Sequence, residues 1–272
     1  MKYSVLASGS RANSCLVKAS RACLLIDAGL SGRATEQRLA AVGINLDSLK
    51  AIFVTHEHRD HINGAGILSR KLKIPIFANR ATAEFIDNPF GIEYFETGVP
   101  FEWKGVHFAP FQISHDAVDP VGFRIEEDGR VLGYATDIGR VTPLLTHSLS
   151  GCHAIVLEAN HDRTLLYDCE YPWQVKQRIS SSHGHLSNDQ TKVLLKAISH
   201  QYLSSVVLAH LSEQSNTPQK AMEAASSARH KSPLVKILCG NPRLATPLTT
   251  LEDPFSIETK IAQNLDSLAS TG

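Results

Sequence analysis

The stretch Thr-His-Glu-His-Arg-Asp-His at residues 55–61 decides how this chain is interpreted, because it gathers four candidate metal ligands: His56, His58, Asp60 and His61. A mixed set of imidazole and carboxylate groups that leaves room for water is typical of a catalytic metal site rather than a structural one. In an extended loop His56 and His58 point the same way, whereas Asp60 and His61 lie past a bend and face a second position. The spacing therefore predicts two divalent metal ions, manganese or zinc, with iron as a further candidate.

The segments on either side place this motif at the end of a strand. Residues 49–54 are apolar and β-branched, which indicates a buried strand, and residues 62–66 are typical of a turn into a helix. Open α/β sheets carry their sites in loops at the carboxyl ends of strands. Upstream, residues 31–42 have helical spacing, with Ser31 as the expected N-terminal cap.

Length and charge indicate one globular α/β domain without a general affinity for polyanions. A chain of 272 residues with 43% hydrophobic content can bury a full core. The 27 basic and 27 acidic residues cancel, so any binding of nucleic acid would depend on a local basic patch and on the metals themselves.

Cysteine usage and the N-terminus predict a cytoplasmic location. The five cysteines are odd in number and never form a Cys-x-x-Cys pair, which favours reduced thiols over disulfides. The N-terminus turns polar before a signal-peptide apolar region could form, and no stretch approaches the length of a membrane span. We expect no membrane partner, and the sequence does not determine the oligomeric state.

The motif resembles the signature of the metallo-β-lactamase superfamily of dinuclear metallohydrolases. This resemblance implies an α/β fold of the αββα sandwich type, with two mixed sheets and helices on the outer faces. We expect the hydrolase domain to span residues 1–244, followed by a C-terminal tail at residues 245–272. Strings over most of residues 1–240 are similar to the YycJ/WalJ-type branch of that superfamily: SGSRANS at 8–14, SHDAVDPVGF at 114–123, EANHD at 158–162, GHLSN at 184–188, and HLS at 210–212 with Asn216.

The resemblance implies a complete set of metal ligands. His115 ends a strand and completes the first metal, and Asp137 ends the strand at residues 130–135 and bridges the two ions. The alternative for Asp137 is a cap on a helix that starts near residue 141. The implied ligands are His56, His58 and His115 for the first metal, Asp60, His61 and His210 for the second, and Asp137 between them.

Further polar residues are assigned around the metals. Asp27 ends a strand and is expected to brace the histidine loop through hydrogen bonds. Ser187 and Gln190 stand at capping-box spacing and so have a structural explanation. His185 has none in its own segment, and the resemblance places it beside the metals as a phosphate binder or proton donor. Asp60 and His185 are therefore the expected catalytic residues.

Candidate substrate contacts come from loops that the resemblance places at the site. Asp116 is interpreted as a residue that orients a ligand, and Lys176 and Arg178 as a basic rim. For Asn160 and His161 the alternative is a purely structural role at the start of the following helix. The expected substrate-binding residues are Ser8, Ser10, Asn13, Asn160 and His161.

The function that the resemblance implies is a metal-dependent 5′-to-3′ exonuclease acting on double-stranded DNA. Hydrolysis would proceed by attack of a hydroxide that bridges the two metals, since two cations that share a water lower its pKa. Two alternatives stay open: a small-molecule or cyclic phosphodiesterase of the same fold, and a non-catalytic nucleic-acid-binding protein. The complete ligand set disfavours the second alternative.

Overall fold

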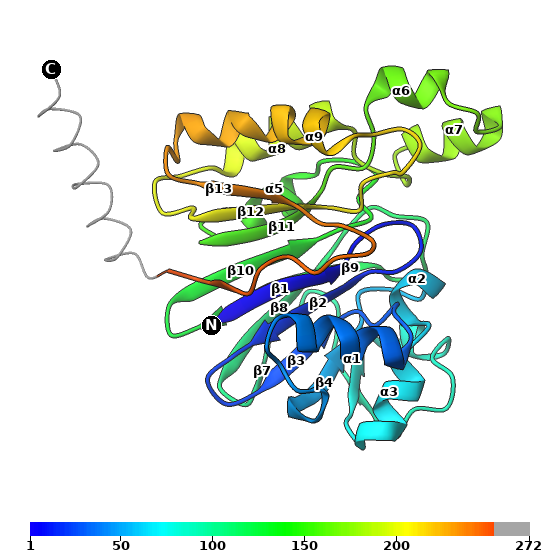
Figure 1. Ribbon diagram of the computed structural model, residues 1–272, viewed down its shortest axis with the longest axis vertical. Coiled ribbons are helices and arrows are strands. Elements are labelled where there is room, and N and C mark those ends of the chain that lie inside the picture. The colour runs from blue at the N-terminus through cyan, green and yellow to red at the C-terminus, as the bar shows by residue number, and fades with distance from the viewer. Residues whose placement is uncertain (253–272) are drawn as a thin grey trace, which may run out of the picture.

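The computed structural model describes residues 1–252, and its strands form two seven-stranded sheets, called sheet A and sheet B here, that pack face to face (Figure 1). Sheet A contains β1 (Lys2–Ala7), β2 (Ser14–Lys18), β3 (Cys23–Ile26), β4 (Leu49–Phe53), β5 (Ile76–Ala78), β6 (Ile92–Tyr94) and β14 (Thr249–Thr250). Sheet B contains β7 (Phe101–Trp103), β8 (Val106–Gln112), β9 (Val121–Glu127), β10 (Arg130–Ala135), β11 (Ala154–Glu158), β12 (Ser205–Ala209) and β13 (Lys236–Cys239).

Both sheets are mixed. Sheet A has the order β14-β1-β2-β3-β4-β5-β6, antiparallel up to β3 and parallel from β3 to β6. Sheet B has the order β13-β12-β11-β10-β9-β8-β7, parallel from β13 to β10 and antiparallel beyond.

Helices cover the outer faces of the two sheets and complete the predicted αββα sandwich. In Figure 1, α1 and α3 lie against sheet A, while α5, α8 and α9 lie against sheet B. Ser31 caps α1, as predicted. Among the helices of residues 1–252, none has the length and apolar character that a membrane span requires. The helices are α1 (Gly32–Ala41), α2 (Arg59–Ile62), α3 (Ala65–Leu72), α4 (Arg80–Ala83), α5 (Pro143–Leu149), α6 (Arg163–Asp168), α7 (Trp173–Ser180), α8 (Asn188–Ile198) and α9 (Pro218–Ala225), with 3₁₀ turns η1 (Leu46–Ser48) and η2 (Ser226–His230).

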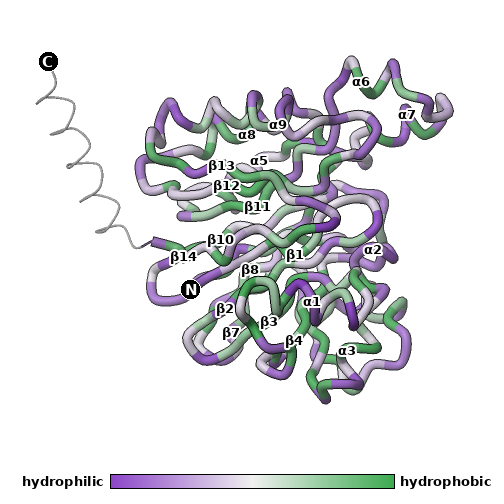
Figure 2. Tube along the Cα trace, in the orientation of Figure 1, coloured by the Kyte–Doolittle hydropathy of each residue, from purple (hydrophilic) through white to green (hydrophobic). Residues whose placement is uncertain are grey.

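Strand β4 shows why the segment before the metal-ligand motif is a continuous apolar run. Phe53 points into the layer between the sheets, where its ring stacks on Phe77 at 4.5 Å and on Phe108 at 4.3 Å between centroids. Its neighbours Ile52 and Val54 face the opposite side, under the helices of sheet A. A strand that is buried on both faces needs apolar residues at successive positions. Figure 2 shows the apolar colouring along the central strands.

The topology brings several carboxyl strand ends to one edge of the sandwich. In sheet B, β10, β11 and β12 are parallel neighbours, so the residues that follow or end them lie side by side. These residues are Asp137, Glu158 and His210. The loop after β4, which carries the metal-ligand motif, faces the same edge.

Part of the segment that the sequence assigned to a tail contacts sheet A. Strand β14 pairs with β1, and Thr246 Oγ1 accepts a hydrogen bond from Val5 N at 2.9 Å. These contacts attach residues 246–251 to the sheet, although the sequence placed the start of the tail at residue 245. The domain boundary at 244/245 stays a prediction, and residues 253–272 lie outside the described residues.

Candidate metal centre

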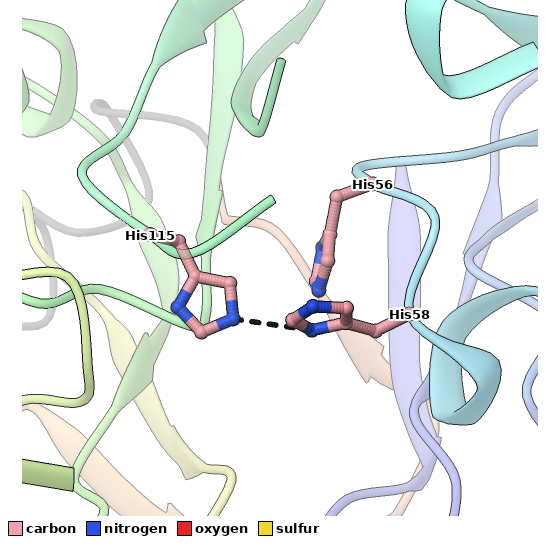
Figure 3. Close-up of side chains that lie close together, drawn as sticks. All are labelled: His56, His58 and His115. Carbon is pink, nitrogen blue, oxygen red and sulfur yellow. Dashed lines mark hydrogen bonds between the residues drawn. The ribbon is translucent and has the colours of Figure 1, made fainter. Parts of the chain in front are cut away.

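Three histidines from two loops form the first group of candidate ligands. His56 and His58 follow β4, His115 follows β8, and their rings converge in Figure 3. His115 Nε2 lies 3.3 Å from His58 Nδ1, and one ligand nitrogen from each of the three rings lies within 4.8 Å of the others. Burial, together with neighbouring imidazoles, lowers the pKa of His56 and of His115. Both rings are therefore neutral at physiological pH, the form that binds a metal ion.

Asp60, His61 and His210 form the second group, and Asp137 lies between the two groups. The Asp60 Oδ2 atom is 3.4 Å from His61 Nε2 and 3.6 Å from His210 Nε2. Asp137 approaches the second group with both oxygens, Oδ2 to His61 Nε2 at 3.2 Å and Oδ1 to His210 Nε2 at 3.4 Å. Its Oδ1 is also 3.8 Å from His115 Nε2 in the first group. The carboxylate therefore occupies the position expected of a bridge.

A cap role for Asp137 is excluded by the start of the next helix. Helix α5 begins at Pro143, and its cap is Thr142, whose hydroxyl accepts from Leu145 N. Asp137 and His210 instead have left-handed backbone conformations, with φ of 60° and 54°. Such conformations are costly for residues other than glycine and persist where the surrounding contacts enforce them, often at functional sites.

In the second group the pKa values of the histidines are raised, whereas in the first group those of His56 and His115 are lowered. Burial disfavours the charged forms, but Asp137, Asp60 and Glu158 outweigh it and raise the pKa of His210 to about 10. Burial is likewise overcome at His61, whose pKa is raised well above its usual value by Asp27 and Asp137. A proton and a divalent cation therefore compete for these imidazoles, since only the neutral ring is a ligand.

Buried polar atoms without hydrogen-bond partners support a cation at this place. His56 Nε2 is buried and has no hydrogen-bond partner among the described residues. His210 Nε2 and Asp137 Oδ2 also lack hydrogen-bond geometry, although each lies near an opposite charge. Native proteins rarely leave such groups unsatisfied. These atoms, with the mixed donor set, fit divalent cations.

Asp27 braces the histidine loop, as the sequence predicted. Its carboxylate is completely buried and accepts hydrogen bonds from Thr55 N at 2.9 Å and from His61 Nδ1 at 2.8 Å. Tyr134 donates to the same carboxylate at 3.3 Å. Because Asp27 holds Nδ1 of His61, the Nε2 atom is directed to the second ligand group.

Glu158 is a site residue that the sequence interpretation missed. It ends β11, is completely buried, and accepts from His185 Nδ1 at 2.8 Å and from the backbone N–H of Ile138 and Leu186. It also lies 3.2 Å from His210 Nδ1. Burial would raise its pKa, but the charge and hydrogen bond of His185 and the hydrogen bond of His210 lower it to about 2. The one available signal was an acidic residue at the end of an apolar run.

Part of each ligand group lines a cavity of about 210 Å³, and the predicted substrate-binding residues divide into two sets around it. Ser10 and Asn160 line the cavity wall. Ser8 and Asn13 are buried behind it: Ser8 Oγ accepts from His210 N at 2.6 Å, and Asn13 Nδ2 donates to Asp60 Oδ2 at 2.9 Å. His161 is buried away from the lining, and burial lowers its pKa to about 4. Substrate binding by all five stays a prediction.

Only part of the predicted basic rim reaches the cavity. Arg178 lines it, and its Nε donates to Asp116 Oδ2 at 2.6 Å. Asp116 Oδ1 in turn lies 3.3 Å from His115 Nε2, and its role in orienting a ligand stays a prediction. Lys176 is not in the lining, and its Nζ donates to the backbone carbonyl of Tyr167.

Comparison with known proteins agrees with the fold. A family model described as "Beta-lactamase superfamily domain" matches residues 23–211, and the chain belongs to this metallo-β-lactamase superfamily. The exodeoxyribonuclease YycJ of Bacillus anthracis is 34% identical over 232 residues, covering 83% of this chain and 88% of that protein. The exodeoxyribonuclease WalJ of Streptococcus pneumoniae is 34% identical over 264 residues, covering 92% and 98%. The resemblance to the YycJ/WalJ-type branch is thereby confirmed.

A solved structure supports the same architecture. The metallo-β-lactamase fold protein YhfI from Bacillus subtilis aligns with a TM-score of 0.68 over 90% of this chain and 98% of its own. The two sequences are only 14% identical, so this similarity concerns the fold alone.

Proposed function

We propose that this chain is a dinuclear metal-dependent phosphodiesterase that removes nucleotides from the 5′ end of double-stranded DNA. The observation that carries the proposal is the Asp137 carboxylate, which lies within 3.8 Å of His115 in the first group and 3.2 Å of His61 in the second. The exodeoxyribonuclease relatives support DNA as the substrate.

Each cation would have its own ligands on this chain. His56, His58 and His115 would hold the first, Asp60, His61 and His210 the second, and Asp137 would contact both. When bound, manganese or zinc would supply Lewis acidity that activates a water and offsets charge on the phosphate oxygens. Ser8 and Asn13 hold the backbone of His210 and the side chain of Asp60 in place.

His185 supplies the proton chemistry beside the ligand groups. Glu158 stays ionised at neutral pH, because its pKa is lowered to about 2, and it accepts the Nδ1 proton of His185. This contact fixes the ring orientation and places a proton on Nδ1, as a carboxylate partner does in catalytic pairs. The Nε2 atom on the far side of the ring can then donate to the leaving oxygen or hold a non-bridging phosphate oxygen.

The experiment is a cleavage assay with protein loaded with Mn²⁺ and a 5′-phosphorylated duplex labelled at either end. We expect nucleotides to be released from the 5′ end, activity to vanish with a chelator, and Asp137→Asn to abolish it. Asp47→Asn, an exposed acidic residue on η1, is the matched control and keeps full activity.

Parallel substrates distinguish the alternatives. Cleavage of cyclic dinucleotides without cleavage of duplex DNA would replace the exonuclease by a small-molecule phosphodiesterase. Duplex binding without hydrolysis in Mn²⁺, Zn²⁺ or Fe²⁺ would indicate a non-catalytic binding protein. Cleavage of RNA in preference to DNA would change the substrate class while keeping the site.

A further inference from the structure

The cavity at the ligand groups has one apolar side, and it comes from a single short segment. The cavity is lined on this side by Val175 and Ile179 of α7 and by Tyr171, which lies just before the N-terminal cap of that helix. The remaining lining side chains are His, Asp, Ser, Asn and Arg, with one glycine. Val175 and Ile179 are four residues apart and so share one face of the helix. We call these three residues the apolar strip.

The apolar strip is not part of the protein core. Helix α7 has no buried residue, Val175 is 37% exposed, and Tyr171 and Ile179 are half-buried. None of the three belongs to the apolar clusters of the described residues. In Figure 1, α6 and α7 project beyond the helices that cover sheet B. Leaving apolar surface in water is unfavourable, so this face is suited to a ligand that covers it.

Contacts with the first ligand group fix the position of the apolar strip. Arg178 pairs with Asp116, and His115 Nδ1 donates to the carbonyl of Gly184 at 3.1 Å. Gly184 lies so close to the end of α7 that a Cβ there would be 2.1 Å from the carbonyl oxygen of Arg178 and 2.3 Å from that of Ile179. The strip is therefore held at a set position beside His115.

We propose that the apolar strip binds the nucleobase of the nucleotide whose phosphate lies at the ligand groups, with the base stacked on Tyr171. This inference rests on the proposed function and names the part of the site that recognises a nucleotide. A planar heterocycle attached to a phosphate matches a cavity with one apolar side and a polar floor. The only charged side chains of α7 are Lys176 and Arg178, both basic, which suits a polyanionic strand.

The cavity size and the lining chemistry define what the strip accepts. Its volume of about 210 Å³ is below the roughly 300–1,000 Å³ of pockets for drug-sized ligands. A site this small is better suited to one unpaired nucleotide than to a base pair, so on this proposal the terminal pair of a duplex would open before cleavage. Stacking tolerates every base, because every base has a π-face, and the strip residues Val175 and Ile179 offer no polar group to read a base edge. We expect little base preference.

The test compares duplex ends whose 5′ nucleotide either carries a base or is an abasic tetrahydrofuran analogue. Stacking on an aromatic side chain should favour the base-bearing end by roughly 5- to 150-fold in kcat/KM. Tyr171→Ala should bring this ratio towards one, mainly through KM, while Tyr171→Phe keeps it. Tyr94→Ala is the matched control, because Tyr94 is an exposed tyrosine of β6 outside the cavity lining. Melting curves verify that each variant is folded.

A binding measurement separates failure of this inference from failure of the proposed function. Calorimetry on the metal-loaded protein compares thymidine 5′-monophosphate with deoxyribose 5-phosphate, and it needs no DNA cleavage. If the nucleotide binds more tightly than the sugar phosphate, and Tyr171→Ala removes this difference, the result supports the strip even when duplex DNA is not cleaved. Equal ratios for wild type and Tyr171→Ala, in cleavage or in binding, would overturn it.

Discussion

Glu158 Oε1 lies 2.8 Å from His185 Nδ1, and the second oxygen of the same carboxylate accepts from Ile138 N and Leu186 N. The backbone amides come from the loops after β10 and before α8, so one buried side chain joins two loops of the site. This arrangement makes Glu158 a positioning residue for His185 rather than a group that touches substrate.

The first prediction is that Glu158→Gln disables His185 while keeping the loops in place. The amide oxygen can still accept from the two backbone donors, but the amide N–H₂ would face Nδ1 of His185 and could not accept its hydrogen bond. We expect cleavage of DNA to slow by roughly 10²- to 10⁴-fold. Glu127→Gln is the control, because Glu127 is also buried and accepts from a backbone N–H, but its ion pair is with the N-terminal amine and not with a histidine of the site.

Metal content must be measured for Glu158→Gln, because Glu158 also lies 3.2 Å from His210 Nδ1. If the variant loses a metal ion and slows equally on all substrates, Glu158 acts through His210 and the positioning role is wrong. Retained metal with slow cleavage supports the link to His185.

The second prediction distinguishes Asp60, a candidate metal ligand, from Asp27, which holds other side chains of the site in position. Asp60 is partly exposed in the cavity, whereas Asp27 is completely buried and holds Thr55 and His61. Asp60→Asn should lose activity by orders of magnitude yet melt within a few degrees of wild type without metal. Asp27→Ala should lower the metal-free melting temperature by roughly 6–20 °C, since it leaves a buried partner unpaired. Similar metal-free melting of both variants would contradict this division.

Four of the seven candidate ligands and the outline of the fold could be predicted because their signals are local. The motif at residues 55–61 is short, and the strand before it is apolar at successive positions because both of its faces are buried. The antiparallel attachment of residues 246–251 to β1 carries no such signal, since it joins segments about as far apart as the described chain allows.

Glu158 and the apolar strip depend on partners that are distant in the sequence. Glu158 gains its role from His185 and His210, which approach it only after β11 and β12 pair. Tyr171, Val175 and Ile179 recur at a spacing of four residues, but this spacing does not indicate what their shared face contacts. In the structure that face borders the cavity.

The third prediction concerns pH and metal uptake. The carboxylates raise the pKa of His210 to about 10, and the pKa of His61 is also raised, so both are protonated between pH 6 and 8. Because each must lose its proton to bind a cation, affinity at the second group should rise with pH, with a log slope between about one and two. The lowered pKa values of His56 and His115 predict a much weaker pH dependence at the first group.

Titration calorimetry with Mn²⁺ or Zn²⁺ in buffers of different ionisation enthalpy counts the protons released. Protein reconstituted at high pH should hold two ions per chain, and mild acidification should empty the second group first. His210→Ala should reduce the slope by about one. Simultaneous loss of both ions, with no proton release on rebinding, would contradict the assignment of the two groups.

The last prediction identifies which role His185 has. An alkoxide leaving group needs a proton, and an imidazole can supply it, so His185→Ala should slow DNA cleavage by roughly 10²- to 10⁴-fold. A nitrophenyl ester of thymidine 5′-monophosphate releases an anion that needs no proton, and its cleavage should be spared. His183→Ala is the control, because His183 is an exposed histidine two residues away and outside the cavity lining. If both substrates slow alike and KM rises, His185 binds phosphate instead. Unchanged rates on both substrates, with unchanged metal content, would remove His185 from the chemistry and leave its contact with Glu158 as a structural bond between two loops.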